Sequence, residues 1–331
     1  MQDASRWRAL VLGGNRYIGR HLVELLAALG CNVTVFNSHP SPLPEGVRRL
    51  HGDRQQPGVL VEVLGPERDS FDVIFDNTSY AMTDVVPLVD LFRGRIAHYV
   101  FTSSVAVYRR SFVQPVLESY RRHAPGDRDP RKAYGVNKVE CEDLLLSLHA
   151  HEGFPASIAR VSHTIGPHTP LSTREPAFFA RLEQGRPILV PGDGHPFVNL
   201  VHVDDVARHL VALGTTPAAA GRAYNVASAE FTSVIGCVQL MARVVGVEAD
   251  IRLVPLDVAR RQQPPLVHWG EALVGGAVYS IERSVAELDW RPELGLEAAY
   301  RDSYAWYDQE GRGQFTFDFA RDDALLAELT T

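Results

Sequence analysis

Short apolar runs alternate with amphipathic segments through the first half of the chain. Residues 9–12 form an apolar run, a helical stretch with leucines on one face follows a Gly-rich turn, and the β-branched run 33–36 comes next. This order predicts a βαβ unit. The same patterns predict further strands at 71–75, 97–102, 198–201 and 223–226, and helices at 81–92, 133–151 and 202–213. The alternation predicts an α/β fold in which a doubly wound parallel sheet carries helices on both faces.

The pattern changes after Arg160, where glycines and prolines divide the chain into short elements. We interpret this part as a smaller, mainly C-terminal substrate-binding lobe. The predicted division gives residues 1–162 and 198–227 to a dinucleotide-binding domain. Residues 163–197 and 228–331 then form the lobe.

Composition narrows the class of protein. The 331 residues are 45% hydrophobic and 22% charged, which is typical of a folded globular chain. No apolar run approaches the roughly 18 residues of a membrane span, and the N-terminus lacks a signal-peptide pattern, so we expect a cytoplasmic protein. Three widely separated cysteines offer no zinc or disulfide pattern, and we expect no metal site.

Charge is distributed unevenly. The net charge of −7 argues against a general nucleic-acid binder. Between Arg109 and Lys132, however, seven cations face three carboxylates, a local balance of +4. Such a segment fits either a solvated loop or an anion site. The cations are Arg109, Arg110, Arg121, Arg122, Arg128, Arg131 and Lys132, and the carboxylates are Glu118, Asp127 and Asp129.

The Gly-rich turn between the first strand and the first helix, residues 13–19, has the position of a dinucleotide-binding turn. Gly13 can make the tight turn, and Gly19 allows close packing of the helix. Arg16 stands where a glycine usually lets the backbone approach the phosphates. In a βαβ setting, the turn predicts a bound NAD or NADP.

Two residues bear on the adenosine half of that cofactor. The second strand ends at Asn37, where an acidic residue would normally bind the ribose of NAD. Arg16 could pair with the 2′-phosphate of NADP, but Ser38 and His39 follow the strand instead of a basic pair. Asp53 is placed to accept a hydrogen bond from the adenine amino group. The choice between NAD and NADP stays open, with a slight preference for tightly held NAD.

Three residues form a candidate catalytic set. Ser104 follows an apolar strand, and Tyr134 and Lys138 are four residues apart, which places them one turn apart on one helix face. A neighbouring ammonium and the positive nicotinamide ring would lower the pKa of the tyrosine, so that it can act as acid or base. Ser104 would hydrogen-bond the substrate oxygen during hydride transfer.

With these motifs in order, the chain resembles the extended short-chain dehydrogenase/reductases of the NAD-dependent epimerase/dehydratase family along nearly all its length. It is most similar to an atypical branch whose turn reads GG-x-R-(F/Y)-x-G and whose C-terminus resembles residues 317–327. The resemblance implies a Rossmann-type fold and a homodimer built on helices near 81–92 and 133–151. The motifs that carry it are 13–19, 102–108, 134–138, 160–167, 192–194, 202–207 and 290–292.

The resemblance also implies which side chains contact the ligands. The implied catalytic residues are Ser104, Tyr134 and Lys138. The implied cofactor contacts are Gly13, Asn15, Arg16, Tyr17, Ile18, Gly19, Asn37, Ser38, Asp53, Arg54, Asn77, Thr78, Thr102, Tyr134, Lys138 and Val161. The implied substrate contacts are Tyr80, Ser104, Val105, His163 and Asn199.

Departures from the family pattern restrict the substrate. Nucleotide-sugar 4-epimerases of the family carry an arginine before the His-Val segment to hold the diphosphate, and here residues 197–200 read Phe-Val-Asn-Leu. His163 replaces the asparagine of the family's R-x-x-N segment and could be a second acid/base. Val105 and Ala106 stand where the 4,6-dehydratases carry an Asp-Glu pair. We therefore expect a polar substrate without a nucleotide diphosphate.

Three hypotheses follow for function. The leading one is an enzyme acting at a secondary alcohol or ketone of a sugar, nucleoside or similar metabolite, through a transient keto intermediate that epimerises or eliminates. The second is an NADPH-dependent ketoreductase with net reduction. The third, from another class, is an RNA-binding protein on the same fold, supported only by the +4 segment.

Overall fold

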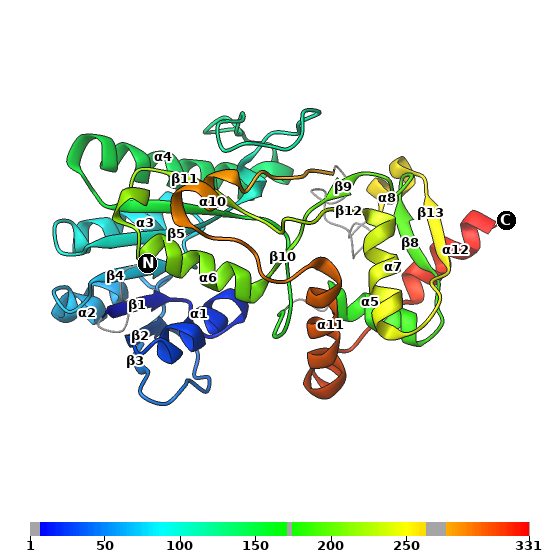
Figure 1. Cartoon of the computed structure of the whole chain (residues 1–331), viewed down its shortest axis with the longest axis horizontal. Helices are drawn as coiled ribbons and strands as arrows, with labels where there is room; N and C mark the ends of the chain where they lie inside the picture. Colours follow the sequence, from blue (N-terminus) through cyan, green and yellow to red (C-terminus); the bar gives the residue numbers. More distant parts are fainter. Residues whose placement is uncertain (1–6, 171–173, 263–275, 331) are drawn as a thin grey trace.

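The computed structural model describes residues 7–170, 174–262 and 276–330, and the protein has two lobes (Figure 1). The larger lobe is built on a seven-stranded, fully parallel sheet in the order β11-β6-β5-β4-β1-β2-β3. Its strands are β1 (Arg8–Leu12), β2 (Asn32–Asn37), β3 (Arg48–His51), β4 (Val73–Asp76), β5 (His98–Ser104), β6 (Ala156–Val161) and β11 (Ala223–Val226). The predicted doubly wound parallel sheet is therefore confirmed.

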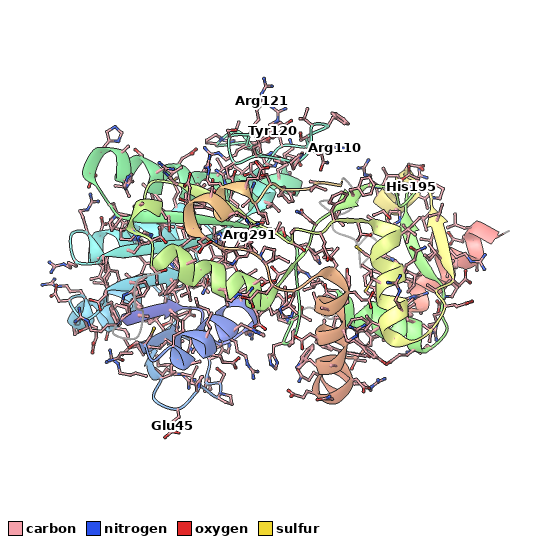
Figure 2. The ribbon with its side chains drawn as sticks, in the orientation of Figure 1. Glu45, Arg110, Tyr120, Arg121, His195 and Arg291 are labelled. Atoms are coloured by element: carbon pink, nitrogen blue, oxygen red, sulfur yellow. The ribbon has the colours of Figure 1, made fainter. Side chains whose placement is uncertain are left out.

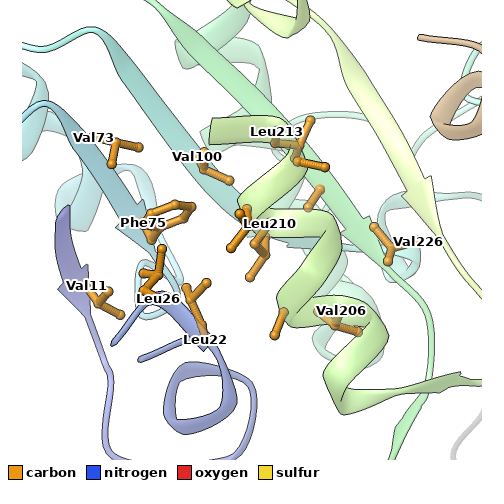
Figure 3. Packing of buried hydrophobic residues seen from close by; sticks show 14 of the residues in the cluster. Val11, Leu22, Leu26, Val73, Phe75, Val100, Val206, Leu210, Leu213 and Val226 are labelled. Carbon is orange, nitrogen blue, oxygen red and sulfur yellow. The ribbon is translucent and has the colours of Figure 1, made fainter. Parts of the chain in front are cut away.

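Helices cover both faces of this sheet because each presents an apolar stripe to it. The helices α1 (Tyr17–Ala28) and α6 (Val203–Gly214) share one face, where Leu22, Leu210 and Leu213 meet Phe75 and Val100 (Figure 3). On the other face, buried side chains come from α2 (Val59–Leu64), α3 (Met82–Phe92) and α4 (Ala133–Glu152). The result is a three-layer sandwich with a core on each side of the sheet.

The smaller lobe has its own apolar core, gathered from α5 (Glu175–Glu183), α7 (Val234–Val245) and α11 (Leu296–Trp306). Its strands form two-stranded pairs: β8 (Ile188–Pro191) with β13 (Ile251–Val254), and β9 (Phe197–Val198) with β12 (Thr232–Ser233). The remaining elements are β7 (Thr164–Ile165), β10 (Val201–His202), α8 (Leu256–Arg261), α10 (Glu282–Leu288) and α12 (Ala320–Thr330).

The predicted strand 198–201 is corrected by the structure. It is divided into β9 and β10, which pair with different partners, because Asn199 between them bonds its amide to the backbone of Ser228 and Tyr279. The predicted division into a dinucleotide-binding domain and a lobe remains a proposal. Of its two ranges, residues 1–6, 171–173, 263–275 and 331 lie outside the described part.

The C-terminal helix α12 is held to the smaller lobe by a buried arginine. Arg181 of α5 is 1% exposed, and its guanidinium reaches Asp322, Asp323 and the carbonyl oxygen of Pro187. Its charge also lies over the ring of Phe319. The C-terminal segment noted in the sequence thus closes the lobe. Over the ranges that the structure describes, no helix is long and apolar enough to cross a membrane.

Candidate active site

A cavity of about 450 Å³ opens at the carboxyl ends of β1, β2 and β4, where parallel α/β sheets bind ligands. Most predicted cofactor residues line it together. They are Gly13, Asn15, Arg16, Tyr17, Ile18, Gly19, Asn37, Ser38, Asp53, Arg54, Asn77, Thr78 and Thr102. Tyr134, Lys138 and Val161 are not among its lining residues, whereas Tyr80, His39 and Pro170 are.

The turn at the floor of this cavity requires its glycines. Gly13 has φ +84°, and a Cβ there would lie 2.2 Å from Cγ2 of Thr78. A Cβ on Gly19 would lie 1.8 Å from the carbonyl oxygen of Gly13. The close approach brings the first turn of α1, whose N–H groups have no partner within the helix, against the cavity.

Asn37 leaves a hydrogen-bonding group open at the adenosine end. Its amide nitrogen donates to the side-chain oxygen of Asn15, whereas its own Oδ1 is buried without a partner. Such an oxygen can accept a hydrogen bond from a ribose hydroxyl. Together with the glycine turn, this orphaned acceptor shows that the residues present fit an adenine dinucleotide. Arg16 is exposed at the same cavity, and Asp53 accepts a bond from the Gln55 backbone.

Arg54 lines the cavity, as expected of a cofactor contact, and it is also bonded within the protein. Its guanidinium donates to Thr78 Oγ1 at 2.7 Å, Ser79 Oγ at 2.9 Å, the carbonyl oxygen of Asp84 at 2.8 Å and the buried Asp76 carboxylate at 3.3 Å. The side chain forms part of the cavity wall, but four of its hydrogen bonds are made within the protein.

The three candidate catalytic residues converge from two elements. Ser104 ends β5, and α4 carries Tyr134 and Lys138 in its first two turns. The Nζ of Lys138 is buried and donates to the carbonyl oxygens of Ser79 at 2.7 Å and Thr102 at 2.8 Å. Burial lowers the pKa of Lys138 to about 8, although Asp76 acts to raise it. The ammonium therefore stays charged at neutral pH.

Tyr134 stands at the mouth of the site, with its ring centre 6.3 Å from that of Tyr80. Burial raises the pKa of Tyr134, and a hydrogen bond from Ser104 and the charge of Arg174 partly offset this. The expectation that Lys138, together with the nicotinamide ring, lowers this pKa stays a prediction. The Lys138 ammonium is bonded to two carbonyl oxygens and lies over the rings of Tyr80 and Phe101.

A buried ionic network holds the reactive ends of β5 and α4 together. Arg160 on β6 bonds Glu142 of α4 through Nε and Nη2 and also reaches the hydroxyl of Tyr108. Ser103, next to Ser104, donates to the same Glu142 carboxylate at 2.6 Å. Because every partner is satisfied, the pair can be kept away from water and fixes the distance between the two elements.

On the substrate side, His163 is backed by a residue that the sequence analysis missed. His163 Nε2 lies 3.5 Å from Oε1 of Glu175, which is 4% exposed, and burial lowers the pKa of His163. The second oxygen of Glu175 is buried without a hydrogen-bond partner among the described residues. Arg174 precedes Glu175 and donates to the Thr164 carbonyl oxygen. An acidic residue at a helix start looks like a dipole partner in sequence, which hid Glu175.

Two other predicted substrate residues are used by the fold. Asn199 is 4% exposed, and its Nδ2 donates to the carbonyl oxygens of Ser228 and Tyr279. Its Oδ1 accepts from the backbone N–H of Tyr279. The expectation that Asn199 binds substrate is therefore corrected. Val105 is 7% exposed and packs in a small apolar cluster with Val107 and Val139. Val161, expected at the cofactor, is 5% exposed in the sheet core.

One cluster has the composition of a metal site. His202, Asp204 and Asp302 bring ligand atoms within 4.8 Å of one another. Both imidazole nitrogens of His202 have partners, however: Nδ1 accepts from the Asp204 backbone and Nε2 lies 3.0 Å from Asp302. Because His202 also caps the start of α6, the cluster serves the fold, and we assign no metal to it.

Comparison with known proteins shows the family to which this chain belongs. The model of the NAD dependent epimerase/dehydratase family matches residues 9–227. A chloroplast stem-loop binding protein of 41 kDa from Arabidopsis thaliana is 27% identical, covering 98% of this chain and 85% of its own. A 2′-dehydrokanamycin reductase from Streptomyces kanamyceticus is 27% identical, covering 67% of this chain and 62% of its own.

The fold is also similar to solved structures. An epimerase from Methanothermobacter thermautotrophicus superposes with a TM-score of 0.76 at 21% identity, covering 94% of this chain and 96% of that one. The family match, which spans more than half of the chain, agrees with the cavity at the glycine turn and with the presence of Ser104, Tyr134 and Lys138 on β5 and α4. The chain therefore belongs to the NAD-dependent epimerase/dehydratase family and is an NAD(P)-dependent enzyme of the short-chain dehydrogenase/reductase type.

Proposed function

We propose that this enzyme acts at a secondary alcohol or ketone of a sugar-, nucleoside- or metabolite-type substrate that lacks a nucleotide diphosphate. The reaction proceeds through a transient keto intermediate, with epimerisation or elimination and Tyr134 as acid/base. The observation that carries the proposal is the grouping of Tyr134 with Ser104 and Tyr80. Tyr80 links this group to the rest of the site, because its ring centre lies 4.9 Å from Nζ of Lys138 and its side chain lines the cavity. When bound, NAD supplies the acceptor for a hydride from the carbinol carbon.

The residues of the site have separate tasks in this proposal. Ser104 hydrogen-bonds the substrate oxygen, and Tyr134 takes the hydroxyl proton and later returns it. Lys138 supplies the buried positive charge and holds the nicotinamide ribose. Asn37 accepts from the adenosine ribose, and Arg16 and Tyr17 line the pyrophosphate end. His163, with Glu175 behind it, moves a proton on the substrate side.

The lack of a diphosphate handle is supported by the segment 197–200. This segment contains no arginine, and Phe197 is 54% exposed. The side-chain amide of Asn199 is hydrogen-bonded to the backbone of Ser228. The proposed branch, with its GG-x-R-(F/Y)-x-G turn, is supported by the sequence of residues 13–19.

Identification of the retained nucleotide tests the proposal. Freshly purified protein is denatured, and the released nucleotide is identified by chromatography and absorbance. Near-stoichiometric NAD or NADH is expected for an internally balanced epimerase or eliminase. Empty protein that prefers NADPH would instead establish the ketoreductase alternative, which the similarity to a 2′-dehydrokanamycin reductase and the exposed Arg16 support. Protein that binds neither nucleotide would contradict both.

A second candidate function is RNA binding, supported by the segment that projects above the sheet lobe. Figure 2 shows Arg110, Tyr120 and Arg121 there, and Arg110 lies 5.5 Å from the ring of Phe112, which is 90% exposed. Not all of the +4 charge is free, because Arg122 pairs with Glu142 and Lys132 with Asp127. The side chain of Arg131 lies outside the described part.

Salt dependence tests this second candidate. Binding of a single-stranded or stem-loop RNA should weaken steeply between low and physiological salt, and Arg110→Ser with Arg121→Ser should reduce the slope. Arg301→Ser, on the other lobe, is the control. Indifference to RNA at low salt would remove the candidate, and the overall charge of −7 favours that result.

The proposed assembly is a homodimer through α3 and α4. Met82 and Val86, one turn apart on α3, are 41% and 42% exposed. On α4, Leu145 is buried in the core, whereas Leu144 and Leu148 are only partly covered. Sedimentation should give a dimer that Val86→Lys converts to monomer. A cytoplasmic location remains a proposal from the sequence alone.

A further inference from the structure

The nucleotide cavity shares one wall with a buried ion pair that reaches the catalytic lysine. Asp76, at the end of β4, is 0% exposed and Arg54 is 9% exposed in its side chain. The Asp76 carboxylate accepts from the backbone of Thr78 and Ser79 at 3.1 and 3.0 Å and from the Tyr99 hydroxyl at 2.6 Å. It also accepts from the Ser79 hydroxyl. Asp76 thus holds Thr78 and Ser79 of the loop 77–80, and the Asp84 side chain holds the backbone of Tyr80 at its end.

Arg54 closes this loop from the other side. Its guanidinium spans Asp76, Thr78 and Ser79 and extends to the first turn of α3 at the Asp84 carbonyl oxygen. A planar fork can join these acceptors in one geometry, which a lysine could not reproduce. Burial would raise the pKa of Asp76, but Arg54, Ser79, Tyr99 and Lys138 hold it below its usual value.

The loop in turn carries two contacts of Lys138. The Ser79 carbonyl oxygen accepts from Nζ at 2.7 Å, and the Tyr80 ring centre lies 4.9 Å from that nitrogen. Only the Thr102 carbonyl oxygen and the Phe101 ring hold Lys138 from β5. Half of what surrounds the ammonium is therefore set by the loop that Arg54 and Asp76 shape.

We propose that the Arg54–Asp76 pair positions Lys138: it fixes the loop 77–80, and through Ser79 and Tyr80 it sets where the lysine charge lies relative to Tyr134. This inference rests on the proposed acid/base role of Tyr134. Arg54 and Asp76 are positioning residues, since neither is assigned a contact with the reacting atoms. Since Arg54 and Thr78 also line the nucleotide cavity, the wall that contacts the cofactor is the wall that places the lysine.

The titration of Tyr134 in the NAD complex tests this inference without a known substrate. The ultraviolet phenolate band is followed against pH in the holoenzyme, and the same curve for Tyr134→Phe is subtracted. The groups facing Tyr134 and Lys138 are Ser104, Tyr80, Arg174, Asp76, Cys141, Glu142 and Arg54. Arg54→Gln should raise the midpoint of the difference curve by at least about half a pH unit.

Two further variants separate position from charge and from folding. Arg54→Lys keeps the charge without the fork, and the midpoint should remain shifted. Ser79→Ala keeps the carbonyl oxygen and the backbone bond to Asp76 but removes the hydroxyl's bonds to Asp76 and Arg54, and it should shift the midpoint in the same direction by less. If Arg54→Gln does not fold, these two carry the test. Arg8→Gln, which removes the exposed ion pair between Arg8 of β1 and Asp72, is the matched control. In this variant Tyr134 should titrate as it does in the wild type.

The outcomes distinguish this inference from the proposed function. If equilibrium dialysis shows no NAD bound to the wild type, or if no Tyr134-dependent band exists, the proposed acid/base role fails and the inference with it. If the wild type binds NAD and shows the band, but Arg54→Lys and Ser79→Ala titrate unchanged, the inference alone is overturned.

Discussion

The nucleotide-binding region and the smaller lobe use their buried polar side chains differently. At the nucleotide cavity, Asn37 keeps an acceptor open and Arg16 keeps its charge exposed. In the lobe, Arg181 and Asn199 use their hydrogen bonds to hold segments that are distant in sequence. An open polar group next to the lobe is found at Glu175, whose second oxygen has no partner among the described residues. The unpartnered oxygens of Asn37 and Glu175 thus differ from the satisfied side chains of Arg181 and Asn199, because they can still accept a hydrogen bond from a ligand.

Removing Arg181 should give the largest effect and should confine it to the lobe. Arg181→Leu leaves Asp322, Asp323 and the Pro187 carbonyl oxygen without their buried partner, which costs about 3–5 kcal/mol. Thermal unfolding should show an early transition of the lobe while NAD binding persists below it. Arg312→Gln, an exposed ion-pair variant, is the control. A single unfolding transition that carries NAD binding with it would show that the two regions are not separable.

Acid should destabilise the nucleotide-binding region first. Burial lowers the pKa of His98 on β5 to about 4 and that of His209 on α6 to about 3. In the unfolded chain both gain protons below about 6.5, so protons favour unfolding between pH 6.5 and 4, and stability falls as pH drops. The loss is about 2 kcal/mol per histidine at pH 5.

Urea unfolding at pH 7 and pH 5 measures this effect. His209→Phe removes one of the two titrations and should reduce the difference between the two pH values. A variant with the wild-type pH dependence would contradict the assignment.

The glycine turn should respond to one added methyl group. Gly13→Ala forces a positive φ on alanine and places its Cβ against Thr78, at a cost of about 1–3 kcal/mol. The Kd for NAD should rise about 10- to 100-fold by calorimetry. Gly313→Ala, where nothing lies within 4 Å of the new Cβ, is the control and should bind NAD normally.

Glu175→Gln should have the smallest effect on stability. The variant removes a buried charge with one unpartnered oxygen, so we expect an unchanged or slightly raised Tm, within about 1 kcal/mol. The pKa of His163 should fall, because the carboxylate that acts to raise it is gone. An NMR titration of the imidazole measures this directly. An unchanged His163 titration would show that Glu175 does not influence the pKa of His163, and Glu175 would then have a structural role alone.

The sequence predicted the sheet where its strands are apolar and missed it where they are not. The edge strand β3 reads Arg-Arg-Leu-His and has little apolar signal. In β6, Arg160 interrupts an otherwise mostly apolar run, and its charge is paired with Glu142 from α4. The glycine turn and the Tyr–Lys spacing are local, so their grouping was predictable.

The substrate side was less predictable for the same reason. His163 and Glu175 are brought together by the fold of the smaller lobe, and neither lies in a motif that contains the other. Asn199 looked like a ligand contact until the backbone of Ser228 and Tyr279 filled its amide. The sequence does not show which polar side chains are hydrogen-bonded within the folded chain.

The ion pair between Arg181 and Asp322 affects the order in which the two lobes can fold during synthesis. These residues are 141 positions apart, so during synthesis α5 is made long before the carboxylates that neutralise its arginine. The parallel sheet, whose last strand ends at Val226, can close earlier. We therefore expect a nascent chain to complete its parallel sheet while the smaller lobe is still open. Loss of the last helix should leave a protein that binds its cofactor but has an incomplete smaller lobe.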